Sequence, residues 1–178
     1  ERVITKSPPL FETQIYIDDT PGISVAQLRA KSRRLKAKHD IDLIVVDYMQ
    51  LLQASADTRE QEISLISRTL KTLARELDVP VLCLAQLNRA VEGRADHKPM
   101  LSDLRESGSI EQDADVIMFL SREDYYNPED PSKKGLTTLT LAKQRNGPTG
   151  SVALTFRSDY MRFEPYTPME EEYEQAPV

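Results

Sequence analysis

The sequence contains no tryptophan, a single cysteine and no long apolar run in its 178 residues. The lone cysteine, Cys83, excludes an internal disulfide and suits a reducing compartment. No stretch approaches the roughly 18 apolar residues that a membrane-spanning helix needs, and no signal-peptide pattern opens the chain. We therefore expect a soluble, cytoplasmic protein that has no membrane partner and a core of Leu, Ile and Val.

Glycine followed directly by lysine is also missing, since none of the six glycines precedes a lysine. A phosphate-binding loop of the Walker A type needs glycine and lysine at fixed spacing, because its backbone N–H groups and its ammonium group cradle the phosphates. These 178 residues therefore lack such a loop.

Charge is unevenly distributed along the chain. The formal net charge is −6, but residues 164–178 contain five glutamates and no lysine or arginine. The remainder is nearly neutral and can still present a local basic surface. The composition predicts one domain over residues 1–165 and an acidic tail over residues 166–178, which has too little apolar content to pack and should be disordered.

Two apolar runs, residues 43–47 and 81–85, flank a segment with apolar residues at helical spacing from Ile63 to Leu77. This order predicts a strand, a crossover helix and a parallel neighbouring strand. Such continuous apolar strands are typical of sheets that are covered on both faces.

Upstream of this unit, residues 15–17 indicate a short strand. Ser24 and Gln27 have the spacing of a capping box, which predicts the start of a helix. That helix is rich in lysine and arginine, which would suit nucleic acid, but we favour a solvated outer face.

The second half of the chain adds further elements. Residues 87–112 read as loop and short helix, 116–120 as a strand, 121–135 as an exposed loop, and 136–142 with 151–156 as an antiparallel hairpin. Together the elements predict an α/β fold with a mostly parallel sheet, flanking helices and an antiparallel edge hairpin.

Polar side chains follow the two predicted parallel strands. Asp47 ends the first strand, and Gln86 follows the second. Open α/β sheets bind ligands at this edge, where a carboxylate suits Mg²⁺ and an amide suits sensing of a γ-phosphate. Taken singly, each residue is also explained as an ordinary loop or capping residue.

The string at residues 104–115 is unusual because two serines flank a glycine amid charged residues. Gly108 permits close approach of the backbone to a phosphate, Ser109 is placed to cap the following turn, and Arg105 can pair with phosphate. From these residues alone, a capped surface turn with an Arg–Glu pair is the favoured interpretation.

Lys143 and Arg145 flank one residue at a strand end, so their side chains should point the same way and reach one anion. The alternative is a surface hairpin whose basic edge discourages aggregation.

Four strings in this order resemble the motor domain of bacterial replicative DNA helicases of the DnaB type: LIVVDYMQL at 43–51, LAQLNR at 84–89, LRESGSIEQDAD at 104–115 and KQRNGPTG at 143–150. The resemblance covers about residues 1–165. It implies a RecA-like P-loop NTPase core that is incomplete at its N-terminal side, because the phosphate loop and the catalytic glutamate of the family precede the matching region.

The resemblance also implies a role for each candidate residue that acts on nucleotide. Asp47 would be the Walker B carboxylate that positions Mg²⁺, and Gln86 would sense the γ-phosphate of ATP. Lys143 and Arg145 would reach the triphosphate of a neighbouring subunit, with Arg145 as the arginine finger. A cation supplied across the interface would couple hydrolysis to subunit movement.

For DNA, the resemblance implies that Arg105, Glu106 and Gly108 lie on a loop that grips single-stranded DNA in the channel of a homo-hexameric ring. Primase and a helicase loader are the implied protein partners, and ATP-driven unwinding at replication forks is the implied activity. Because the Walker A loop is missing, we expect the isolated chain to be inactive as an ATPase. Two alternatives stay open: a non-catalytic module that binds DNA or helicase subunits, and another RecA-like ATPase of recombination or repair.

Overall fold

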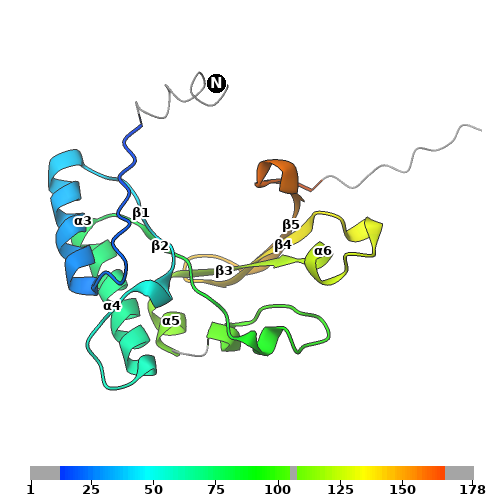
Figure 1. The fold of residues 1–178 in the computed structure, drawn as a ribbon, viewed down its shortest axis with the longest axis horizontal. Helices are drawn as coiled ribbons and strands as arrows, with labels where there is room; N and C mark the ends of the chain where they lie inside the picture. Colours follow the sequence, from blue (N-terminus) through cyan, green and yellow to red (C-terminus); the bar gives the residue numbers. More distant parts are fainter. Residues whose placement is uncertain (1–12, 105–107, 167–178) are drawn as a thin grey trace, which may run out of the picture.

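The computed structural model describes residues 13–104 and 108–166 (Figure 1). Helices α3 and α4 lie at one end of the molecule, and strands β4 and β5 extend toward the other. The predicted strand at residues 15–17 is wrong, because this segment pairs with no strand of the described chain. Its side chains stay largely exposed, at 67% for Ile15 and 86% for Ile17.

Helix α3 (Val25–His39) begins at the predicted capping box. The Ser24 side chain accepts a hydrogen bond from the backbone N–H of Gln27, whose side chain accepts one from the Ser24 backbone N–H. The basic surface of α3 is partly used for packing, since Arg29 and Arg33 both pair with Glu76 of α4.

The strand–helix–strand unit is confirmed. Strand β1 (Ile44–Val46) and strand β2 (Val81–Cys83) are parallel and paired from Ile44 with Val81 to Val46 with Cys83. Helix α4 (Arg59–Leu77) connects them, is capped by the Thr58 side chain and buries its apolar stripe in the core. The fold is therefore α/β, as predicted.

The antiparallel part of the fold is larger than an edge hairpin. Four antiparallel strands lie in the order β3-β4-β5-β6, whereas the parallel part of the described chain is the β1–β2 pair: β3 (Val116–Arg122), β4 (Leu136–Gln144), β5 (Gly150–Arg157) and β6 (Arg162–Pro165). The connections from β4 to β5 and from β5 to β6 are too short for parallel pairing, because a parallel neighbour needs a crossover of a dozen or more residues. Strand β6 was not predicted from the sequence, because its residues lack an apolar run.

Short helices occupy the connections. Helix α5 precedes β3, and α6 lies in the segment that we predicted as loop: α5 (Gly108–Asp113) and α6 (Glu123–Tyr126). Short 3-10 helices occur in other segments of the described chain: η1 (Met49–Leu51), η2 (Arg89–Val91), η3 (Leu101–Leu104), η4 (Pro131–Lys133) and η5 (Ser158–Tyr160).

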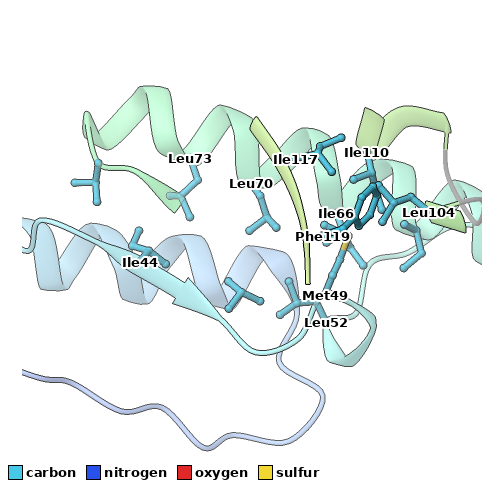
Figure 2. Close-up of a cluster of buried hydrophobic side chains, with 13 residues drawn as sticks. Ile44, Met49, Leu52, Ile66, Leu70, Leu73, Leu104, Ile110, Ile117 and Phe119 are labelled. Carbon is cyan, nitrogen blue, oxygen red and sulfur yellow. The ribbon is translucent and has the colours of Figure 1, made fainter. Parts of the chain in front are cut away.

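One hydrophobic core joins the parallel and antiparallel parts. Figure 2 shows side chains from β1, α4, α5 and β3 gathered together, and all of these are at least nine-tenths buried: Ile44, Ile66, Leu70, Leu73, Ile110, Ile117 and Phe119. Close packing of this kind stabilises by about 1.5–3 kcal/mol for each fully buried large aliphatic side chain. Strand β3 is thus held by side-chain packing although it is not hydrogen-bonded to β1 or β2.

The face of β1, β2 and β3 that points away from the core is apolar, and the described residues leave it uncovered. The alternate residues that point away from the core are each 45–55% exposed: Val45, Leu82, Leu84, Val116, Met118 and Leu120. The expectation that the first strand is covered on both faces is therefore not met here, because α3 and α4 pack on one face only. In the part of the chain that the structure describes, no helix has the length and apolar character to cross a membrane.

Candidate functional site

Asp47 and Gln86 lie at the same edge of the parallel pair. Asp47 directly follows β1, and Gln86 comes three residues after β2, so both stand beyond the carboxyl ends of paired strands. Both residues are exposed. The peptide bond from Asp47 to Tyr48 is cis. The edge predicted for ligand binding in an open α/β sheet thus presents a carboxylate and an amide side chain to solvent.

Gln50 ties the two strand ends together. Its side-chain N–H donates to the backbone carbonyl of Gln86 at 3.1 Å, and its side-chain oxygen accepts from the Gln86 backbone N–H, also at 3.1 Å. The backbone N–H of Met49 donates to the carbonyl of Leu84 at 2.8 Å beside this bridge. Sequence reasoning assigned no role to Gln50, because a side-chain bond across 36 positions leaves no local pattern.

The residues at this edge fit Mg²⁺ only as part of a larger site. No group of three or more His, Cys, Asp or Glu side chains within residues 13–104 and 108–166 is arranged to hold a metal ion. Mg²⁺ typically keeps several waters and takes one or two carboxylates together with phosphate oxygens. A single exposed carboxylate such as Asp47 suits that mode of binding, and it does not suit an all-protein metal cage.

The segment after Gln86 is anchored by an ion pair whose carboxylate is buried. The Asp103 side chain is 4% exposed, pairs with Arg94 and accepts a hydrogen bond from the backbone N–H of Met100 at 2.8 Å. The hydrogen bond from Arg94 holds the pKa of Asp103 below its ordinary value. The backbone carbonyl of Asp103 accepts from the N–H of Asn88 at 2.9 Å, so this carboxylate residue fixes the loop that leaves the strand edge.

A cavity of about 60 Å³ lies beside Gln50, Gln86 and Asn88. Small-molecule sites usually measure about 300–1,000 Å³. This cavity is too small for a nucleotide, so a nucleotide at this edge would rest against further residues.

Of the residues predicted to contact DNA, Arg105 and Glu106 lie outside the described residues. Gly108 is the first residue of α5 and is exposed, and a Cβ added there would meet no atom within 4 Å. Packing therefore does not require glycine at this position. The prediction that Ser109 caps the following turn is wrong. It lies inside α5, and its hydroxyl donates to the hydroxyl of Ser64 on α4 at 2.9 Å.

Lys143 and Arg145 point the same way, as predicted, and both reach the carboxyl end of α5. Lys143 Nζ donates to the carbonyl of Glu111, and Arg145 Nη2 donates to the carbonyl of Gln112 at 2.7 Å. Cations are favoured there by the negative end of the helix dipole and by unpaired carbonyls. Within the described residues, no hydrogen bond or ion pair joins either cation to the strand edge that carries Asp47.

Asp115 forms a second anchor for Arg145. Its carboxylate lies 3.2 Å from Arg145 Nε, and its backbone carbonyl accepts from the Arg145 N–H at 3.0 Å. The same carboxylate pairs with Lys71 of α4. The hydrogen bond from Lys71, with the nearby charges of Lys71, Arg145 and Arg75, holds the pKa of Asp115 below its ordinary value. Sequence reasoning did not single out Asp115, although it directly precedes the strand that pairs with β4.

Comparison with known proteins gives a consistent picture. The family model of the DnaB-like helicase C-terminal domain matches residues 1–165. The chain is 55% identical over 157 residues to the replicative DNA helicase DnaB of Geobacillus stearothermophilus, covering 86% of this chain and 34% of that protein. The replicative DNA helicase DnaC of Bacillus subtilis (strain 168) matches with the same identity and coverage.

Two solved structures share the fold. One is a DnaB-like replicative helicase studied with its interactions with primase, and the other is an ATPase domain. Each is 46% identical with a TM-score of 0.83 and matches 89% of this chain, which covers 38% of the first structure and 57% of the second. The chain spans about a third of the length of the curated relatives that it matches. With a family match over residues 1–165 and close relatives in both sequence and fold, this chain belongs to the DnaB-like helicase C-terminal domain family.

Proposed function

We propose that this chain is the C-terminal part of the motor of a replicative DNA helicase, which couples ATP hydrolysis to translocation on single-stranded DNA and to duplex unwinding. The observation that carries the proposal is the division of the candidate residues between two places. Asp47 and Gln86 share one strand edge, whereas Lys143 and Arg145, at the end of β4, contact the carboxyl end of α5. This division suits a site completed by two subunits of a ring.

At the strand edge, Mg²⁺ beside Asp47 would neutralise charge on the phosphates of ATP. Asp47 would hold a water-coordinated ion through an exposed carboxylate, and Gln86 would donate its side-chain amide to the γ-phosphate. Gln50 would keep these two residues in register, because it joins the strand ends by two hydrogen bonds. Each of these roles needs an exposed polar group on a rigid support, which this edge offers.

Arg145 would act on the triphosphate of the neighbouring subunit, with Lys143 beside it. Half of the Arg145 side chain is exposed, so the guanidinium is accessible to another molecule. A cation supplied by the neighbour stabilises the charge that develops in phosphoryl transfer. Hydrolysis would then depend on the geometry of the interface in a homo-hexamer.

The segment with Arg105, Glu106 and Gly108 would contact the phosphate backbone of single-stranded DNA. Primase and a helicase loader would be protein partners of the complete protein, which would work in the cytoplasm. Support for the first of these partners comes from a structural relative, a DnaB-like replicative helicase that was studied with its interactions with primase.

The isolated chain would not hydrolyse ATP. It has no glycine followed by lysine, and the β1, β2 and β3 face is uncovered by the described residues. The solved ATPase domain that it matches is also longer, since the chain covers 57% of it. Mg²⁺-dependent ATPase activity of the purified 178-residue chain that is lost on Asp47→Ala would contradict this part of the proposal.

Subunit mixing of the full-length protein that carries this chain tests the shared site. Asp47→Asn and Arg145→Ala should each lower DNA-stimulated ATPase activity by about 100-fold or more. Rings that contain both variants should regain activity, because some interfaces then combine an intact Asp47 with an intact Arg145. If mixed rings stay inactive while both variants form hexamers, the two-subunit site is wrong.

A further inference from the structure

Arg145 is held at its backbone and along one side of its guanidinium. Its backbone N–H and its Nε both contact Asp115, at 3.0 Å to the carbonyl and 3.2 Å to the carboxylate, while Nη2 reaches the carbonyl of Gln112. No described residue forms a hydrogen bond or ion pair with Nη1. The guanidinium is therefore fixed by one side and leaves its other side open to an anion.

Asp115 is itself held by the core helix α4. Lys71, whose side chain is 21% exposed, pairs with Oδ2 of Asp115, whereas Arg145 Nε lies near Oδ1. The carboxylate thus lies between two cations that come from different elements. The neighbouring cations hold the pKa of Asp115 below its ordinary value, so the carboxylate stays charged and paired with Arg145 even in mildly acidic solution.

Helix α5 strengthens this arrangement because it is attached to α4 at two further points. The Ser109 hydroxyl donates to Ser64 at 2.9 Å, and the Ser67 hydroxyl donates to the carboxylate of Asp113 at 2.9 Å. Ile110 of the same helix is buried in the core. The carbonyls that receive Arg145 therefore keep a defined position relative to α4.

We propose that Asp115 is a positioning residue for Arg145, which presets the guanidinium of one subunit for the nucleotide phosphates held by its neighbour. The inference rests on the proposed function of Arg145. A free arginine side chain has many rotamers, and a fixed carboxylate removes part of that freedom before the neighbour docks. Asp115 touches no phosphate itself in this scheme and acts only through Arg145.

The first test measures ATPase kinetics of the full-length protein. Asp115→Ala should lower kcat by about 10- to 100-fold, with the KM for ATP, hexamer formation and affinity for single-stranded DNA within about twofold of the unchanged protein. Asp115→Glu retains a carboxylate and should recover a measurable part of the lost kcat. The matched control is Asp113→Asn, two residues away, which removes a carboxylate charge but keeps a side-chain oxygen that can accept from the Ser67 hydroxyl. Because the attachment of α5 to α4 is kept, this variant should retain kcat. An unchanged kcat in Asp115→Ala would overturn the proposal.

The second test asks in which subunit Asp115 acts. Rings that mix Asp115→Ala with Asp47→Asn should regain activity, because a defect in Arg145 is repaired by a neighbour with an intact Arg145. If these rings stay inactive while rings mixing Arg145→Ala with Asp47→Asn recover, Asp115 does not act through Arg145 and the inference fails alone. If neither mixture recovers, the two-subunit site fails first and takes the inference with it. Asp115→Asn, which keeps the side-chain shape, replaces Asp115→Ala in both tests if the alanine variant does not assemble.

Discussion

The side chain of Gln50 makes two hydrogen bonds of 3.1 Å with the backbone of Gln86, donating to its carbonyl and accepting from its N–H. The side-chain amide thus makes the two hydrogen bonds that a paired strand residue would make, beyond the point where β1 and β2 stop pairing. Because Asp47 precedes Gln50 by three positions, this bridge sets the spacing between the two polar residues at the strand edge. The Gln50 side chain thus has a structural role, whereas the exposed Gln86 side chain is the one that we propose to contact the γ-phosphate.

The two glutamines should behave differently when each is replaced by alanine. Gln50→Ala removes two hydrogen bonds and should lower the free energy of unfolding by about 1–2 kcal/mol. Gln86→Ala removes an exposed side chain and should change it by less than about 0.5 kcal/mol, while lowering the ATPase activity of the full-length protein. Urea denaturation and ATPase assays measure both effects. Equal loss of stability in the two variants would contradict this division.

Gly108→Ala should separate DNA binding from stability. A Cβ at Gly108 meets no atom within 4 Å, so the change should keep or raise the free energy of unfolding by up to about 1 kcal/mol. Affinity of the full-length protein for single-stranded DNA should fall, as fluorescence anisotropy can measure.

Gly135→Ala is the matched control for Gly108→Ala. Gly135 has a φ of +71°, and an added Cβ would lie 2.7 Å from the carbonyl oxygen of Phe156. Gly135→Ala should lower the free energy of unfolding, and the folded protein should keep its affinity for single-stranded DNA. If Gly108→Ala leaves DNA affinity unchanged, the assignment of Gly108 to the DNA segment is wrong.

Asp103 should make stability depend on pH in the acidic range. Its pKa is lowered in the folded protein, so the unfolded chain takes up its proton at a higher pH. The stabilisation is complete above the ordinary carboxyl pKa of about 3.9 and is lost as the pH falls through the lowered value.

Asp103→Asn is accordingly expected to lower the free energy of unfolding by about 2 kcal/mol at pH 7, because the charge-assisted bond from Arg94 is lost. The difference between variant and unchanged protein should shrink as the pH drops below about 4. Denaturation series at pH 7 and at acidic pH test this. A difference that stays constant over the whole range would show that the ionised carboxylate is not the cause.

The exposed apolar residues of β1, β2 and β3 should make the isolated chain prone to self-association and to binding of hydrophobic dyes. Exposed apolar side chains that gather on a protein surface promote association and bind hydrophobic dyes. We expect the 178-residue chain to bind ANS more strongly than the full-length protein does, and Leu82→Lys with Met118→Lys to reduce that binding. Tyr125→Lys, at a 72% exposed residue of α6, is the control and should have little effect. If the double variant binds the dye as strongly as the unchanged chain, the dye does not bind at the exposed residues of β1, β2 and β3.

Local patterns in the sequence were enough to predict the main elements. The apolar runs became β1, β2 and β3, and the helical spacing from Ile63 to Leu77 became α4, because burial of one stripe or strand depends on residues that are close in sequence. The capping box at Ser24 is local in the same sense. Residues 15–17 failed as a strand because pairing needs a partner that no local pattern provides.

The candidate site was predictable to the same limit. Asp47 and Gln86 could be assigned to one edge because parallel strands end together, and Lys143 and Arg145 to one side because alternate strand residues share a face. Gln50 and Asp115 could not be identified in this way, since their partners Gln86 and Arg145 are distant in the sequence.

The sequence by itself determined the positions of β1 to β5, the polar residues that follow β1 and β2, and the absence of a glycine–lysine pair, because each of these follows from neighbouring residues. Only the tertiary structure decided that the strand edge is bridged by Gln50 and that the two cations rest on α5 beside Asp115. It also decided that alternate apolar residues of β1, β2 and β3 stay exposed among the residues that the structure describes. Contacts between distant segments depend on how α4, α5 and β4 pack around the core, and that packing is a property of the whole fold.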